Sequence, residues 1–142
     1  MVIAGNLLTF HAIGDWNYDT PITAFGTTNE ALQAKLTANT KVDFRGQRAG
    51  WDLIQELPKT FGLAWDSDYY HAYNEYTKYN HPYKVSMYLS HGLPVIVWKE
   101  AAVANFIVDN HLGLAIDNLD ELDATIQTIS DEQISDLLDH VN

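Results

Sequence analysis

The chain has 142 residues, of which 46% are hydrophobic, 12% aromatic and 19% charged, as expected for one globular domain rather than a disordered or fibrous chain. Its 8 Lys and Arg against 19 Asp and Glu give a formal net charge of −11, which argues against a nucleic-acid or anionic-membrane partner. Cys is absent, so disulfides and cysteine nucleophiles are excluded, and the longest apolar runs fall far below the ~20 residues of a membrane span. We therefore expect a soluble, cytoplasmic protein.

Short apolar, β-prone segments recur along the chain, most of them with Gly or Pro at a boundary. The predicted strands are residues 2–4, 22–25, 42–44, 61–65, 95–98 and 114–116. Stretches with the period of an amphipathic helix lie between and after these strands. The predicted helices are residues 29–37, 47–57, 83–90, 100–109, 119–129 and 131–141, the last with Ser130 as its N-cap. We predict that the Tyr-rich stretch 67–80 is partly helical.

The alternation of strands and helices predicts a doubly wound α/β domain, in which a parallel sheet of about six strands carries helices on both faces. The chain begins almost directly with a strand, and we expect it to be a fragment of a longer protein. From Asp117 to the end there are eight acidic residues and no Lys or Arg. The rest of the chain is therefore less acidic and can hold a local anion site.

Ligands of such a sheet lie at the carboxyl ends of its strands, where loops lead into helix N-termini. The first strand is followed by Gly5 and Asn6, and the glycine either lets a ligand approach the backbone or makes a tight turn, with equal support. Neither GxGxxG nor GxxxxGK[ST] occurs, so the dinucleotide and P-loop classes lose support. The third strand is followed by Arg45 and Gly46, where a base or phosphate would fit but solvated arginines are the simpler interpretation.

The strongest local signal lies at the start of the predicted helix 83–90. Asn80 or His81 suits the N-cap and Pro82 suits the first turn, which places Lys84 at the positive end of the helix dipole. A cation is unfavourable there unless an anion such as a diphosphate occupies the helix end. An exposed lysine whose stem covers apolar surface explains the pattern equally well.

Small residues open the predicted helix 100–109 after the fifth strand. The backbone N–H groups near Glu100, Ala101 and Ala102 would be accessible to a sugar or phosphate. The spacing alone favours a simpler role, in which Glu100 complements the helix dipole. The acidic stretch 66–68 favours an N-cap or turn over a metal site, and we predict no metal.

Several longer runs resemble one family in order and spacing. They are KYNHPYK at 78–84, YLSHGLPVIVW at 88–98 and AAVANFIVDNHLGL at 101–114, together with AGNL at 4–7 and GLAWD at 62–66. These runs resemble the C-terminal half of the glucosyltransferase 3-like family, and the similarity spans most of the chain. The resemblance implies a Rossmann-like domain that forms the C-terminal half of a bacterial GT-B glycosyltransferase.

By this resemblance, residues 1–142 form the domain that binds the nucleotide-sugar donor, and the N-terminal acceptor domain is absent from this chain. The family includes enzymes that use UDP-glucose to extend glycosylated serine-rich adhesins. The resemblance therefore implies transfer of glucose or another hexose from a UDP-sugar to a glycan or glycoprotein, without a metal or further cofactor. The chain alone would bind the donor but not transfer the sugar, and a homo-oligomer is compatible with this interpretation.

The resemblance also implies roles for individual residues, although it assigns no catalytic residue. Asn80 and Lys84 would hold the donor diphosphate, in agreement with the dipole argument. Gly5 and Asn6 would lie by the phosphates, Arg45 and Gly46 by the base, and Glu100 with the amides of Ala101 and Ala102 by the donor sugar.

A competing interpretation is a non-catalytic Rossmann-like module that uses the stretch 67–80 and the acidic C-terminal helices for protein contacts. Such a module would be indifferent to nucleotides. A flavodoxin-like or receiver-like domain also suits the length, but the exit of the first strand lacks both an acidic cluster and a phosphate loop.

Overall fold

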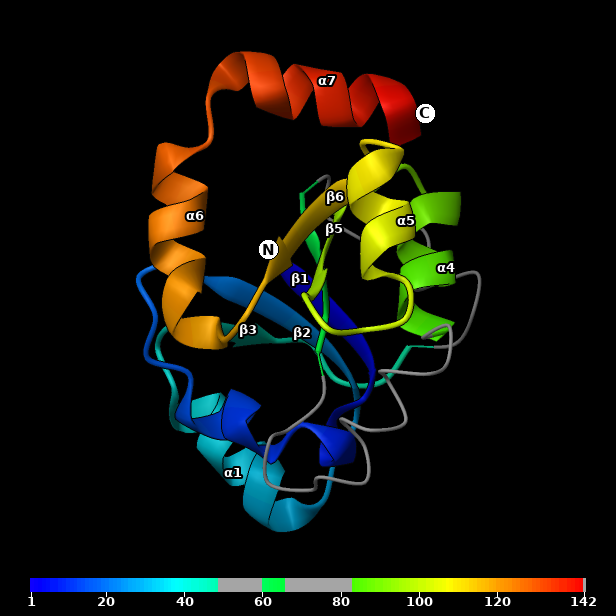
Figure 1. Ribbon diagram of the computed structural model, residues 1–142. Helices are drawn as coiled ribbons and strands as arrows, with labels where there is room; N and C mark the ends of the chain where they lie inside the picture. Colours follow the sequence, from blue (N-terminus) through cyan, green and yellow to red (C-terminus); the bar gives the residue numbers. More distant parts are fainter. Residues whose placement is uncertain (49–59, 66–82, 142) are drawn as a thin grey trace.

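The computed structural model of the chain describes residues 1–48, 60–65 and 83–141. Six parallel strands form one sheet in the order β3-β2-β1-β4-β5-β6 (Figure 1). The strands are β1 Val2–Asn6, β2 Ile22–Thr27, β3 Val42–Phe44, β4 Gly62–Ala64, β5 Val95–Trp98 and β6 Gly113–Ile116. The predicted parallel α/β sheet and all its predicted strands are confirmed.

Helices cover both faces of this sheet. They are η1 Leu7–Thr9, η2 His11–Asp15, α1 Glu30–Ala38, α4 Tyr83–Ser90, α5 Ala104–Asp109, η3 Leu119–Glu121, α6 Leu122–Thr128 and α7 Asp131–Val141. Because successive strand residues point to opposite faces, Ile3 joins the core formed with η1, η2, α1 and α6, whereas Val2 and Ala4 join the core formed with α4 and α5. Among the residues that the structure describes, no helix combines the length and the apolar character that crossing a membrane requires.

Side-chain caps fix where α1 and α7 begin. The side-chain oxygen of Asn29 accepts a hydrogen bond from the backbone N–H of Leu32 at 2.8 Å. At α7, the hydroxyl of Ser130 accepts from the backbone N–H of Gln133 at 3.1 Å, and the Gln133 side chain accepts from the Ser130 N–H at 2.9 Å. This reciprocal pair is a capping box. The N-cap predicted at Ser130 is therefore confirmed.

In the C-terminal half of the chain, two predicted helices differ in their bounds from the helices of the structure. The predicted helix 100–109 begins only at Ala104, because residues 99–103 form turns in which the Ala101 N–H donates to the Trp98 carbonyl at 2.9 Å. These turns bury Ala101 and Val103 in the core. The predicted helix 119–129 is divided into η3 and α6.

The connection between β1 and β2 is helical, although the sequence predicts no helix there. Leu7, Phe10, Ile13 and Trp16 are all buried and lie three residues apart, which is the period of a 3-10 helix. Each of the last three donates its backbone N–H to the carbonyl of the preceding one. The predicted helix 47–57 and the Tyr-rich stretch 67–80 lie outside the described residues, apart from residues 47 and 48, which are not helical.

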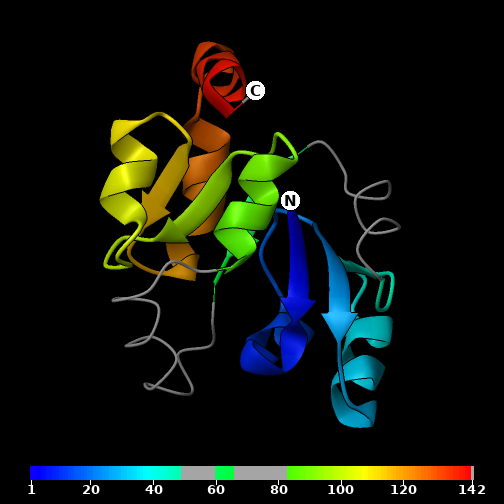
Figure 2. The ribbon, with the colours of Figure 1, turned by 90° about the vertical axis from the view of Figure 1, so that its right-hand side faces the viewer.

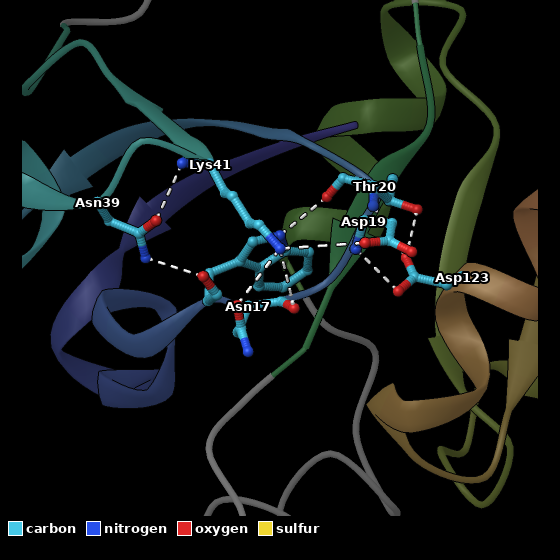
Figure 3. A network of polar contacts seen from close by, with 7 residues as sticks. Asn17, Asp19, Thr20, Asn39, Lys41 and Asp123 are labelled. Atoms are coloured by element: carbon cyan, nitrogen blue, oxygen red, sulfur yellow. Dashed lines mark hydrogen bonds and ion pairs between the residues drawn. The ribbon is translucent and has the colours of Figure 1, made fainter.

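A polar network joins the segment before β2 to α6 (Figure 3). The Asp123 carboxylate accepts hydrogen bonds from the backbone N–H groups of Asp19 at 2.8 Å and Thr20 at 2.9 Å, and from the Thr20 hydroxyl at 2.8 Å. Desolvation raises the pKa of Asp123, but these hydrogen bonds and the charge of Lys41 outweigh it and hold that pKa below its usual value. An ionised Asp123 therefore fastens α6 to the chain that leads into β2.

Candidate functional site

The strand order reverses at the centre of the sheet. From β1 the chain adds β2 and β3 on one side, and from β4 it adds β5 and β6 on the other. Figure 2 shows these two groups apart, with η1, η2 and α1 beside the first and α5, α6 and α7 beside the second. β1 and β4 share a single register pair, Val2 with Gly62. Ligands of open α/β sheets bind at the carboxyl ends of the strands at such a reversal, so the candidate site lies there.

Tyr88 of α4 links β1 and β4. Its hydroxyl accepts a hydrogen bond from the backbone N–H of Ala4 at 3.1 Å and donates one to the carbonyl of Leu63 at 2.9 Å. The ring lies on Gly62, where any Cβ would overlap ring atoms. Burial raises the pKa of Tyr88 well above its ordinary value, against the smaller effect of the Ala4 hydrogen bond. Tyr88 is therefore a neutral donor that holds α4 across the centre of the sheet.

The same helix brings Lys84 to Gly5. Lys84 lies one turn before Tyr88 on α4, and Gly5 in β1 has a φ of 134°, a conformation that favours glycine. A Cβ on Gly5 would lie 3.1 Å from Cε and 3.9 Å from Nζ of Lys84. The structure thus brings together two residues that the sequence singles out separately. Asn6 is the last residue of β1 and Asn80 lies outside the described residues, so their ligand contacts stay predictions.

A second glycine extends the site along β2. Gly26, the register partner of Gly5, has a φ of 149°, and a Cβ on it would overlap the Gly5 carbonyl. Its N–H donates to the carbonyl of Gly46 at 3.0 Å. Beside these residues is a pocket of about 150 Å³ lined by Gly5, Phe25, Gly26, Thr27, Gln47 and Arg48. Gly26 is not among the site residues predicted from the sequence. The signal that could have found it is a glycine directly after the apolar run of the second strand.

Arg45 is engaged by its own neighbours. Its guanidinium lies 2.9 Å from the Asp43 carboxylate and 5.9 Å from the centre of the Phe25 ring. Arg48 lines the pocket, and Arg45 is not one of its lining residues. A contact between Arg45 and a base stays a prediction, and it requires the guanidinium to share or leave Asp43.

The structure separates Glu100, Ala101 and Ala102 from the start of α5. The predicted helix start at Glu100 is wrong, because these residues form the turns that follow β5. The Ala101 N–H is occupied by the carbonyl of Trp98 and is not open to a sugar. Glu100 and Ala102 are exposed, and their contact with a donor sugar stays a prediction.

A larger groove, of about 520 Å³, lies where β5 and β6 end against α6. Lys99 and Asp117 are the first residues after these two strands, and the Lys99 ammonium lies 3.9 Å from the Asp117 carboxylate. Asp120 and Glu121 also line the groove and make it acidic. The sequence does not predict this groove, because the ends of β5 and β6 become neighbours only through their pairing in the sheet.

Three curated proteins are similar to this chain. Glucosyltransferase 3 of Streptococcus gordonii is 28% identical over 143 aligned residues, which cover 99% of this chain and 41% of that protein. Glucosyltransferase 3 of Streptococcus parasanguinis is 26% identical over 138 residues, 96% of this chain and 39% of that protein. Beta-1,6-galactofuranosyltransferase WbbI of Escherichia coli (strain K12) is 42% identical over 76 residues, 51% of this chain and 23% of that protein. The chain thus spans well under half the length of these relatives.

The family described as "Glucosyltransferase 3-like, C-terminal domain" matches residues 1–142. The match covers the whole chain and agrees with the resemblance carried by the sequence runs. The six-stranded parallel sheet fits the Rossmann-like fold that this resemblance implies. The chain belongs to the glucosyltransferase 3-like C-terminal domain family.

Proposed function

We propose that this chain binds the UDP-sugar donor of a glycosyltransferase, and that the whole enzyme transfers glucose or another hexose to a glycan or glycoprotein. The observation that carries the proposal is the position of Lys84 against Gly5 where the strand order reverses. A cation, an exposed glycine backbone and the first turn of α4 meet there, and these groups suit a diphosphate. The family and the names of the relatives support the transferase class.

The proposed chemistry follows from the charge of the leaving group. Cleavage of the bond between the sugar and the diphosphate leaves negative charge on UDP, and the Lys84 ammonium and the positive end of α4 would stabilise that charge. Tyr88 holds α4 on β1 and β4 through two buried hydrogen bonds. Lys84 is therefore positioned before the donor arrives. The proposal assigns charge stabilisation to these protein groups rather than to a metal ion.

The remaining parts of the donor and the acceptor have proposed places as well. The pocket beside Gly46 and Arg48 would receive the base, and the exposed residues Glu100 and Ala102 would face the sugar. An N-terminal domain outside this chain would bind the acceptor, which is consistent with relatives that are more than twice as long. This chain alone would then bind the donor without transferring the sugar.

Calorimetric titration with UDP, UDP-glucose and UDP-galactofuranose, and with ADP and GDP for comparison, tests the proposal. Lys84→Ala should weaken UDP binding by about 10- to 100-fold, because a hydrogen bond to a charged group contributes ~1.5–3 kcal/mol. Lys35→Ala is the matched control. Lys35 lies in the last turn of α1 and forms an exposed ion pair with Asp15, so its substitution removes the same charge away from the site. The affinity of this variant for UDP should equal that of the unaltered chain.

Selective binding of UDP that only Lys84→Ala weakens supports the proposal. Equal weakening in both variants would show that net charge, and not the site, governs binding. If no nucleotide binds even at millimolar concentration, the titration is repeated on a protein that includes the N-terminal domain. Absence of binding there as well would overturn the proposal and favour a non-catalytic interaction module.

A further inference from the structure

Two histidines and an aspartate meet at the amino edge of the sheet, opposite the proposed donor site. His111 lies in the turn that leads into β6, and Asp136 and His140 lie one turn apart on α7. One possible ligand atom from each of the three lies within 4.8 Å of the others. His111 Nδ1 is 2.7 Å from Oδ2 of Asp136, and His140 Nδ1 is 3.4 Å from Oδ1 of the same carboxylate. The two imidazole rings stack with their centroids 4.9 Å apart.

We propose that His111, Asp136 and His140 bind a zinc ion. Imidazole nitrogens and carboxylate oxygens are zinc ligands at about 2.0–2.2 Å, so two ligand atoms on a tetrahedral ion are about 3.3–3.6 Å apart. The separation of 3.4 Å between His140 Nδ1 and Asp136 Oδ1 lies within this spacing, whereas that of 2.7 Å between His111 Nδ1 and Asp136 Oδ2 is the shorter distance of a direct hydrogen bond. His140 Nδ1 also lies 2.7 Å from the backbone carbonyl of Asp136. Small side-chain rotations would replace the direct hydrogen bonds by bonds to the ion. Three protein ligands leave the fourth position to water.

The three groups are accessible and suitably charged. Their side chains are 56% exposed at His111 and 46% exposed at Asp136 and at His140, so an ion reaches them from solvent without opening the fold. Asp136 contacts both imidazoles, and an aspartate carboxylate is ordinarily ionised at neutral pH. The site therefore offers an anionic oxygen and two imidazoles to a divalent cation.

The backbone at His111 supports a role for its side chain. Its φ of 56° is the one positive value outside glycine in the described part of the chain. Leu112 N–H donates to the Ile107 carbonyl at 2.9 Å and His111 N–H to that of Val108 at 3.2 Å, the two bonds of a Schellman motif, whose left-handed position favours glycine. The chain has a histidine at this position instead, and its imidazole meets α7.

A zinc ion at this site would fasten α7 to the rest of the domain. Leu137 is the buried residue of α7, and most of that helix faces solvent. Because an ion held by both His111 and α7 binds only the folded arrangement, it would raise the melting temperature as its concentration rises. The site is separate from Gly5 and Lys84, so this proposal does not rest on the proposed function.

The test uses the chain without an affinity tag, first freed of metal with a chelator. Competition with a chromophoric zinc chelator should show one zinc ion per chain, and thermal unfolding should show a melting temperature that rises with zinc. His111→Gly removes one ligand and supplies the residue that the backbone favours, so it should fold normally without zinc. Its zinc affinity, and that of His140→Ala, should fall at least about tenfold, the loss that even an outer-shell change can cause.

His91→Ala is the matched control, because His91 lies at the end of α4 with its ring nitrogen 2.6 Å from the Met87 carbonyl. It should bind zinc as the unaltered chain does. Unchanged affinity in His111→Gly and His140→Ala would overturn the proposal, as would absence of zinc binding in the unaltered chain. Displacement of zinc by equimolar magnesium would also overturn it, since that would indicate diffuse attraction to the chain's net charge of −11.

Discussion

Tyr88→Phe should destabilise the domain, although it removes a single oxygen atom. The lost hydroxyl leaves the Ala4 N–H and the Leu63 carbonyl without the partner that each has in the buried centre of the sheet. An unsatisfied buried group costs about 1–3 kcal/mol. Because a small shift of the strands can recover part of one hydrogen bond, we expect a loss of about 2–4 kcal/mol in the free energy of unfolding. The phenylalanine ring still packs on Gly62, so no cavity contributes.

Urea unfolding at neutral pH, followed by the fluorescence of the 4 tryptophans, measures this loss. Tyr18→Phe is the matched control, because the Tyr18 hydroxyl donates to Asp120 at 3.3 Å in an exposed pair, and its removal should change stability by less than about 0.5 kcal/mol. The m-value, which is the slope of the free energy of unfolding against urea concentration, should stay the same in both variants. A loss below about 0.5 kcal/mol for Tyr88→Phe would refute the assignment of its hydroxyl as the link between β1 and β4.

Three further variants test the fold. The pKa of Asp123 is lower in the folded than in the unfolded chain, so its contribution to stability is present above the unfolded value of about 3.9 and is lost as the pH falls through the folded value. Asp123→Asn should therefore lose less stability on acidification than the unaltered chain, and parallel acid-unfolding curves would contradict this. Gly26→Ala should cost at least about 2 kcal/mol, because a Cβ meets the Gly5 carbonyl and the φ of 149° is unfavourable; an unchanged melting temperature would show that the strands adapt. Ser130→Ala should cost about 1 kcal/mol in urea unfolding through the lost cap of α7, and Ser130→Asp, which can cap as well, should recover most of it.

The six strands could be predicted because strands covered on both faces are continuous apolar runs. Residues 95–98 and 42–44 match β5 and β3. β1 continues two residues past its apolar run because Gly5 and Asn6 still pair with β2. The helix period of 3.6 could not reveal η1 and η2, because the buried residues of the segment 7–16 that contains them are three apart.

Only part of the candidate site could be predicted from the sequence. Lys84 could be singled out from its local sequence, because a cation at the start of a helix is unfavourable unless an anion lies beside it. Its contact with Gly5 depends on the strand order, which no local pattern contains. Asp136 and His140 have the spacing of neighbours on one helix face, but the arrival of His111 depends on how α7 returns to the turn before β6.

The single register pair between β1 and β4 has a consequence for folding. The sheet divides into two units, β3-β2-β1 and β4-β5-β6, each joined internally by longer ladders. Cooperative unfolding then depends on what crosses between them, namely the two apolar cores that both units share and polar links such as Tyr88 and Asp123. A diphosphate held between Gly5 of the first unit and Lys84 of the helix that packs on the second would act as a non-covalent cross-link, and its binding energy would couple the two units into one unfolding event.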